Sequence, residues 1–156
     1  LRLVGFDYRQ PTAYFVTICA RARACIFGQV RGGEVRLYPV GLKVKEVWEQ
    51  IPSVSPGVRL DVFVVMPNHL HGIVWLRPPE VGAPVRSLGQ VIRAFKARVT
   101  FASRSLGEGA IFQSDFYDHI IRDEADLERV RAYILENPAR WDSNPDNPEV
   151  GSGQAR

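Results

Sequence analysis

Two apolar runs in the middle of the chain, only two residues apart, most constrain how it can fold. Residues 60–66 and 69–76 are rich in β-branched and other apolar side chains, and the Pro67-Asn68 pair between them is typical of a tight turn. The two runs therefore predict a β-hairpin. Because alternate side chains of a strand point to opposite faces, each run presents two different faces to the elements that cover it.

Segments on both sides of this hairpin carry either strand or helix patterns. Residues 12–20 are β-branched and aromatic, which favours a buried strand, and residues 26–40 predict a second hairpin around Gly32-Gly33. Elsewhere apolar residues recur at helical spacing. In chain order, the other expected elements are a helix over 42–52, a helix capped by Ser87 that ends before Gly107, a strand over 111–121 interrupted near Ser114-Asp115, and a last helix over 123–137.

Apart from the second hairpin, the order of elements is strand, helix, strand, strand, helix, strand, which is the split βαβ, ferredoxin-like pattern. We therefore expect an α/β (α+β) fold with a ferredoxin-like antiparallel sheet, an inserted hairpin and an appended C-terminal helix. In that topology the first and third strands are central. One face of strand 69–76, including Leu70, would then pack on the two amphipathic helices. The opposite face, which holds His69 and His71, would be covered by helix 123–137.

The length and composition fit one folded domain. We expect residues 1–141 to form it and residues 142–156, which are rich in Pro, Asn, Gly and Ser, to be disordered. No apolar run approaches the ~18 residues of a membrane span, and no secretory signal is visible. Cys19 and Cys25 form no Cys-x-x-Cys pair, so we expect reduced thiols in a cytoplasmic protein without a membrane partner, with a disulfide as the alternative. Because the chain starts at Leu1 rather than Met, we expect further sequence before it.

Positive charge is concentrated between residues 77 and 104. The whole chain has a net charge of +3, but in this segment six Lys or Arg residues stand against Glu80 alone. Arg93, Lys96 and Arg104 lie off the apolar stripe of the expected helix. A basic stripe attracts polyanions, so these three side chains are candidates for holding one. A solvated helix face is the alternative interpretation.

His69 and His71 are one residue apart at the start of an expected strand, so both side chains share one face. Two neighbouring imidazoles can bind one metal ion. The alternative is two polar residues at a strand end, one capping the turn and the other in solvent.

The last helix carries an apolar stripe at Leu127, Val130 and Ile134, with Tyr133 and Asn137 one turn apart along its edge. If the stripe packs on the sheet, Tyr133 and Asn137 reach over the histidines. The amide oxygen of Asn137 could then be a third metal ligand, and Tyr133 a nucleophile. Alternatively, Tyr133 is an ordinary packed helix residue and Asn137 ends the helix before Pro138.

Four stretches resemble one protein family. The sequence Met-Pro-Asn-His-Leu-His-Gly at 66–72 closely resembles the His-hydrophobe-His motif of the single-tyrosine HUH transposases. Residues 116–138, in which Tyr-x-x-x-Asn-Pro follows Ile-Ile-Arg, resemble the subgroup called REP-associated tyrosine transposases, as do Gly5-Phe6-Asp7-Tyr8 and residues 14–18. The resemblance extends to about Trp141, and Tyr-x-x-x-Asn-Pro is its specific motif. Phe112-Gln113 departs from the expected Trp-Gln.

The resemblance implies a ferredoxin-like fold and metal-dependent cutting of single-stranded DNA through a 5′-phosphotyrosine intermediate. It implies that Tyr133 is the nucleophile, and that His69, His71 and Asn137 bind Mg²⁺ or Mn²⁺, with Asn137 where many relatives carry Gln. It further implies a target of repeated extragenic palindromes that fold into hairpins. On this interpretation Arg93, Lys96 and Arg104 are predicted to hold the DNA backbone, and Arg122 and Arg129 are further predicted DNA contacts near the tyrosine.

Other interpretations remain open at this stage. Tyr117 and His119 would share a strand face, so Tyr117 is a rival nucleophile with a neighbouring base. A metal-dependent hydrolase would use water in place of a tyrosine, and a non-catalytic module for single-stranded nucleic acid would need neither metal nor tyrosine. A mobile and a domesticated role are equally compatible with the sequence, as are a monomer and a homodimer that shares its tyrosines.

Overall fold

The structure, a computed structural model, describes residues 11–78 and 85–150. The Gly5-Phe6-Asp7-Tyr8 stretch and residues 151–156 lie outside the described residues. One antiparallel sheet organises the fold, in the strand order β4-β5-β1-β6. Its strands are β1 (Thr12–Cys19), β4 (Val58–Met66), β5 (His69–Leu76) and β6 (Tyr117–Ile121).

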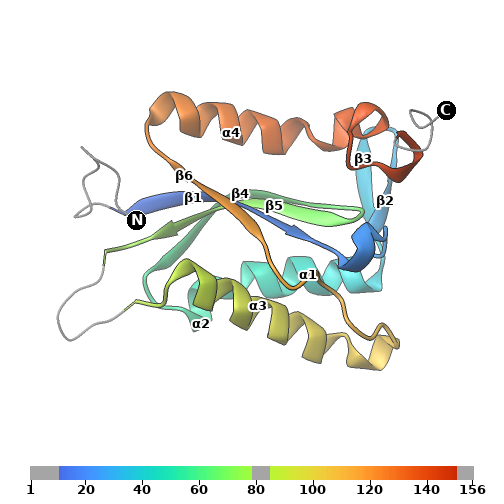
Figure 1. The fold of residues 1–156 in the computed structure, drawn as a ribbon, viewed down its shortest axis with the longest axis horizontal. Coiled ribbons are helices and arrows are strands. Elements are labelled where there is room, and N and C mark those ends of the chain that lie inside the picture. Colours follow the sequence, from blue (N-terminus) through green and yellow to red (C-terminus); the bar gives the residue numbers. More distant parts are fainter. Residues whose placement is uncertain (1–10, 79–84, 151–156) are drawn as a thin grey trace.

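The topology confirms the ferredoxin-like prediction. Strand β5 pairs with both β4 and β1, and β1 also pairs with β6, so the first and third strands of the split βαβ pattern are central. The inserted hairpin consists of β2 (Gly28–Arg31) and β3 (Glu34–Leu37) and forms a separate two-stranded sheet. It stands at one end of the main sheet (Figure 1).

Helices cover both faces of the sheet (Figure 1). The helices α1 (Pro39–Glu49) and α3 (Leu88–Ala102) lie on one face, and α4 (Glu124–Glu136) lies on the other. The short helical segments are η1 (Arg21–Arg23), α2 (Ile51–Val54), η2 (Arg104–Leu106) and η3 (Pro138–Ser143). In the described ranges no helix is long and apolar enough to cross a membrane.

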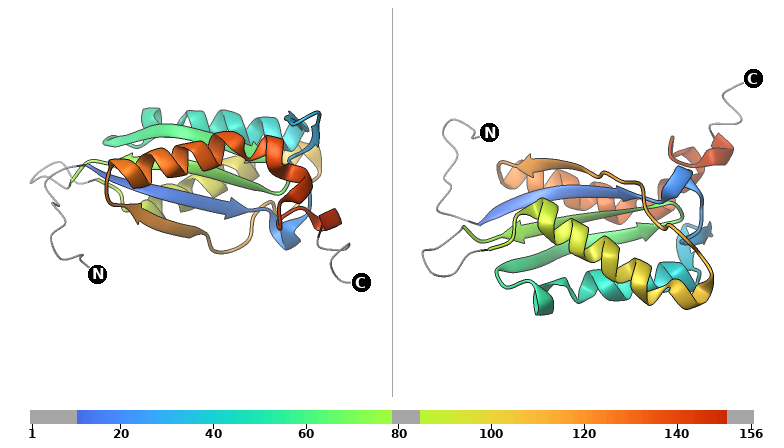
Figure 2. Two further views of the ribbon diagram at one scale, coloured as in Figure 1. Left: turned by 90° about the horizontal axis from the view of Figure 1, so that it is seen from above. Right: turned by 60° about the horizontal axis from the view of Figure 1, so that its bottom comes forward.

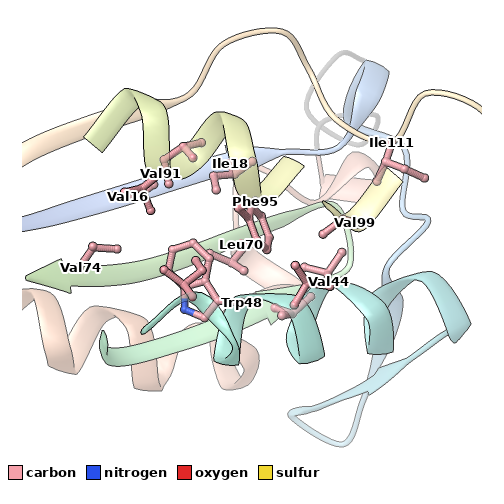
Figure 3. Packing of buried hydrophobic residues seen from close by; sticks show 14 of the residues in the cluster. Val16, Ile18, Val44, Trp48, Leu70, Val74, Val91, Phe95, Val99 and Ile111 are labelled. Atoms are coloured by element: carbon pink, nitrogen blue, oxygen red, sulfur yellow. The ribbon is translucent and has the colours of Figure 1, made fainter. Parts of the chain in front are cut away.

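The larger core lies between the sheet and the pair α1 and α3. Trp48, Phe95 and Leu70 meet there (Figure 3), and the two aromatic ring centroids are 5.2 Å apart. A Cβ atom on Gly72 would lie 2.7 Å from the Trp48 ring, so β5 needs a glycine where the indole crosses it. Ser87 and Gln90 form the predicted capping box at the start of α3.

The smaller core lies between α4 and the opposite sheet face. Leu127, Val130 and Ile134 of α4 are buried against Ile73 of β5. This confirms that the C-terminal helix covers the face that holds the histidines. The helix begins after Asp123, whose side chain accepts a hydrogen bond from the Asp126 amide, and Asn137 is its last, capping residue.

Two elements differ from their predicted limits. Helix α1 begins at Pro39 rather than at residue 42, because proline has the fixed φ that the first helical position requires and gives up no needed donor there. The expected strand 111–121 is reduced to an isolated bridge at Phe112 and to β6. Between them the ammonium of Lys96 binds the carbonyls of Gln113 and Asp115, which therefore take no part in a strand ladder.

The chain after the last long helix also differs from expectation. We expected disorder from Asp142 on, but η3 extends to Ser143, residues 144–147 form turns and residues 148–150 are helical. Asn144 and Asn147 are buried in these turns. The Asn147 amide donates to the Trp141 carbonyl, and the Asn144 side chain accepts from the Asp146 amide. Short polar side chains thus supply hydrogen bonds that an irregular backbone lacks.

Candidate metal and nucleophile site

The two predicted metal ligands lie at the start of β5, directly after the Pro67-Asn68 turn. His69 and His71 are 2% and 4% exposed, and their ring centroids are 4.4 Å apart. In the sheet register His71 is opposite Thr17 of β1 and His69 is opposite Cys19. Both rings point to the face that α4 and η3 cover. There the ring centroids of His69 and Trp141 are 6.4 Å apart.

Asn68 determines which nitrogen of His69 is free. Its Nδ2 donates to the Arg23 carbonyl at 3.2 Å and to the Asp146 carbonyl at 2.8 Å, so its Oδ1 is the atom that faces His69 Nδ1, at 2.8 Å. An amide oxygen only accepts, so His69 Nδ1 carries the proton and His69 Nε2 has a lone pair. This is the arrangement in which a second residue orients a metal-binding histidine.

Thr17 holds the His71 ring, because its Oγ1 lies 2.8 Å from His71 Nδ1. A hydroxyl can accept as well as donate, so this contact is compatible with a lone pair on His71 Nε2. The Nε2 atoms of both His69 and His71 are buried and have no hydrogen-bond partner within the described part of the chain. Buried polar atoms are otherwise nearly always paired. Two adjacent unpaired ring nitrogens on one side of a sheet are what a metal ion would satisfy.

The electrostatics of the site favour neutral rings. Burial, assisted by the Arg23 charge, lowers the pKa of His69 to about 4. Burial and the neighbouring His69 lower the pKa of His71 to about 3. Both imidazoles are therefore uncharged at neutral pH, which is the form that binds a metal.

Asp146 completes a group that sequence reasoning missed. One ligand atom from each of His69, His71 and Asp146 lies within 4.8 Å of the other two. The same carboxylate pairs with the Arg23 guanidinium at 2.8 Å. We had placed Asp146 in a disordered tail. The local signal for order was the Asn-Pro-Asp-Asn-Pro run at 144–148, since Asn and Asp side chains build turns by bonding nearby backbone.

Asn137, the third ligand expected from the sequence, makes different contacts. Its Nδ2 donates to the Tyr133 carbonyl at 2.8 Å, and its Oδ1 accepts from Asn144 Nδ2 at 3.3 Å. The buried Asn137 amide therefore connects the end of α4 to the turn that carries Asp146. In this geometry Asn137 acts on the histidine pair indirectly, by holding the turn that carries Asp146.

Tyr133 lies where a nucleophile could meet both the histidines and a large substrate. Its ring centroid is 5.4 Å from that of His71 and 6.0 Å from that of Phe15. The residue is 42% exposed, so the ring packs at its base while solvent reaches the side chain. The structure thus brings Tyr133, His69 and His71 together.

Tyr117 lies on the same sheet face as the histidines but does not contact them as Tyr133 does. In the register, Tyr117 of β6 is opposite Thr17, which is opposite His71, so strand β1 separates Tyr117 from the histidine. His119 is opposite Phe15, at 5.5 Å between ring centroids, and its Nε2 lies 3.8 Å from an Asp126 carboxylate oxygen.

The five predicted DNA-binding side chains do not form one surface. Arg93, Lys96 and Arg104 belong to α3 and the short helix after it, on the sheet face opposite α4 (Figure 1). Two of the Lys96 donors are already used by backbone carbonyls. Arg122 and Arg129 instead line a cavity of about 450 Å³ beside α4.

Comparisons with known proteins identify the fold and the family. No family model matches the chain. The fold is similar to the structure of a REP-associated tyrosine transposase bound to a REP hairpin, with a TM-score of 0.63 and 19% identity over 90% of this chain and 74% of that one. It is also similar to a candidate transposase of Deinococcus radiodurans, with a TM-score of 0.55 and 16% identity over 88% of this chain and 97% of that one.

The chain therefore has the fold of the REP-associated tyrosine transposases, as the sequence motifs implied. At the level of sequence, it is 36% identical over 162 residues to an uncharacterized protein of Haemophilus influenzae, covering 92% of this chain and 89% of that protein. The chain belongs to the same family as that Haemophilus protein.

Proposed function

We propose that this protein is a transposase-like endonuclease that cuts single-stranded DNA and becomes joined to it through Tyr133, with a divalent metal as cofactor. The observation that carries the proposal is the pair of buried, unpaired Nε2 atoms of His69 and His71 beside the Tyr133 ring. A purely structural histidine pair would be expected to have hydrogen-bond partners for these nitrogens.

The residues present fit a metal ion. His69 and His71 would bind it through Nε2, and Asp146 would add a carboxylate oxygen. Asn137 would act by holding the turn of Asp146, or as a ligand itself after a change of side-chain conformation. A bound Mg²⁺ or Mn²⁺ supplies Lewis-acid stabilisation of charge on the scissile phosphate. Imidazole ligands favour Mn²⁺ among metals that also accept carboxylates.

The proposed chemistry at Tyr133 is an exchange of one phosphodiester for another. The phenol loses its proton to solvent, its oxygen bonds to phosphorus, and the bond from phosphorus to the 3′-oxygen breaks. The departing 3′-oxygen takes a proton from solvent. The products are a 5′-phosphotyrosine and a strand that ends in a 3′-hydroxyl. Because a phosphodiester is kept, a 3′-hydroxyl can reverse the step and join strands without a separate energy source.

Arg23 is the cation that pairs with the carboxylate of the proposed metal site. Its guanidinium is half exposed and pairs with Asp146, and both Ala22 and Arg23 have left-handed backbone conformations, at φ of 54° and 53°. Non-glycine residues in this region are uncommon, and such strain is concentrated at functional sites. We propose that Arg23 contacts the phosphate next to the bond that is cut.

The partner that we propose is DNA with a hairpin. The REP-associated neighbour was solved with a REP hairpin bound. We extend this partner class to the present chain because its exposed tyrosine and its two basic regions suit a polymer rather than a small molecule.

Labelled hairpin DNA with a single-stranded extension tests the proposal. Incubation with Mn²⁺ should attach the label covalently to the protein, and a chelator should prevent it. Cleavage without attachment would indicate a hydrolase that uses water. Binding without cleavage in any divalent metal would indicate a non-catalytic module, and either result would overturn the proposal.

A further inference from the structure

An exposed aromatic side chain lies on the helical layer away from the tyrosine. Phe101, near the end of α3, is 66% exposed, the largest exposed fraction among the large hydrophobic side chains in the described ranges. Helix α3 lies on the sheet face opposite α4 (Figure 2). The ring therefore plays no part in the site around His69 and His71, and its exposure needs a separate explanation.

Arg104 holds its guanidinium over this ring. Its Cζ lies 3.8 Å from the Phe101 ring centroid, and its Nη1 donates to the Phe101 carbonyl at 2.7 Å. The hydrogen bond and the cation–π contact together fix an aromatic plane and a cation at one place on the surface. Aromatic rings and arginine planes are the two kinds of side chain on which unpaired bases stack.

Two grooves meet at this ring. One, of about 620 Å³, runs between α3 and residues 110–114, and Phe112 and Thr100 contribute to its wall. The other, of about 500 Å³, runs between α1 and α3. Phe101 lines both grooves, so a flat group stacked here has room on each side for a connected chain.

The charges around the grooves select the partner. Among the described residues that line the first groove, Lys96 and Arg104 are basic and none is acidic. The second is lined by Lys43 and Arg98 against Glu46 alone. An apolar ring beside a basic lining suits a base attached to phosphates better than it suits an apolar protein surface.

We propose that Phe101 and Arg104 form a stacking subsite for an unpaired base of single-stranded DNA, remote from Tyr133. This inference rests on the proposed action on DNA. The segment that borders the first groove leads directly into β6, an edge strand of the sheet. A DNA strand held at Phe101 would pass β6 to reach the sheet face on which Tyr133 lies. The subsite therefore recognises nucleotides at a distance from the bond that is cut.

Phe101→Trp tests the subsite without requiring cleavage. In a chelator, oligothymidine should quench the fluorescence of the new indole, and an abasic oligonucleotide of the same length, which has the phosphates but no bases, should not. The matched control is Leu42→Trp, because Leu42 on α1 is 54% exposed and lines neither groove. The wild type, with its 3 tryptophans, gives the background.

Phe101→Ala should weaken oligothymidine binding about 5- to 100-fold, and Phe101→Tyr should restore it, because stacking needs a ring rather than a particular residue. Equal quenching by the abasic strand, or none by oligothymidine, would overturn the inference. So would self-association of the chain that Phe101→Ala abolishes, since the ring would then be a contact between copies. Attachment of hairpin DNA to protein, measured in parallel, reports separately on the proposed function.

Discussion

Single side chains decide what the start of β5 can bind. Asn68 uses both of its amide hydrogens on backbone carbonyls and thereby leaves only its oxygen for His69. Thr17 holds the His71 ring from the neighbouring strand. Two imidazoles are thus fixed with their free nitrogens side by side, at a burial that keeps both uncharged. This preorganisation is the local reason to expect tight metal binding.

Replacing either histidine should remove the metal. We expect His69→Ala and His71→Ala to lose Mn²⁺ binding in calorimetry and to lose cleavage, while circular dichroism shows a folded chain. His119→Ala is the matched control, because this third histidine is outside the group around Asp146 and should leave Mn²⁺ binding unchanged. Normal Mn²⁺ binding by either of the first two variants would show that the site is misassigned.

Asp146→Asn tests the ligand that the structure adds. It keeps the size of the side chain and removes the negative charge of a direct ligand. Mn²⁺ affinity should therefore fall by at least the roughly 10- to 100-fold typical of losing an outer-shell partner at a metal site. Asn137→Asp distinguishes the alternatives. If Asn137 is the third ligand, this variant should bind Mn²⁺ more tightly while Asp146→Asn has no effect, and that pair of results would contradict our assignment.

At the scale of elements, the position of α4 decides whether Tyr133 meets the histidines. The helix is packed through a small apolar core and is fixed by one polar cluster. Arg131 donates from Nη2 and Nε to the two carboxylate oxygens of Asp61 on β4, at 2.7 and 3.0 Å. The Trp75 indole donates to the same carboxylate at 3.1 Å. Asp61 therefore connects the tyrosine helix to two strands.

The Asp61 cluster makes the free energy of unfolding depend on pH, and the pKa of Asp61 gives the direction of that dependence. Hydrogen bonds from Arg131, then from the Val62 amide and Trp75, outweigh burial and lower the pKa of Asp61 from 3.8 to about 2. A lowered pKa means that the stabilisation is complete above about pH 4 and is lost as the pH falls through 2.

Asp61→Asn should accordingly lower the free energy of unfolding at pH 7 by about 1 kcal/mol, because solvent at the partly exposed Arg131 screens the pair. Urea titrations at pH 7, 4 and 2 measure this. The difference between wild type and variant should shrink only between pH 4 and 2. A difference that is the same at all three pH values would rule out the charged pair as its cause.

At the scale of the whole molecule, basic side chains occupy both outer layers, so bound DNA would contact more than one face. Arg93 lines a groove beside α3, and among the described residues its side chain makes none of the backbone hydrogen bonds that occupy Lys96. We expect Arg93→Ala to weaken binding of any DNA sequence and to reduce the slope of log affinity against log salt by about one charge. An unchanged slope would mean that this part of α3 is simply solvated.

A feature of the fold or of the candidate site could be predicted from the sequence where local interactions determine it. Strand alternation puts His69 and His71 on one face, and helical spacing puts Tyr133 on the edge of the stripe that packs on the sheet. The fold and the nearness of these three side chains could therefore be predicted from the sequence. The position of Asp146 could not be predicted in this way. An irregular turn, held together by side-chain hydrogen bonds, brings Asp146 close to the histidines, and such a turn leaves no periodic pattern in the sequence. The direction of the Asn68 amide likewise depends on residues 45 and 78 positions away.

The identity of the tyrosine that joins DNA tests the central claim most directly. After reaction of labelled hairpin DNA with the protein and Mn²⁺, digestion and mass spectrometry should find the nucleotide on the peptide that contains Tyr133. Tyr133→Phe should abolish the adduct and leave DNA binding nearly unchanged, while Tyr117→Phe should still form it. A nucleotide on Tyr117, or an undiminished adduct in Tyr133→Phe, would contradict the account.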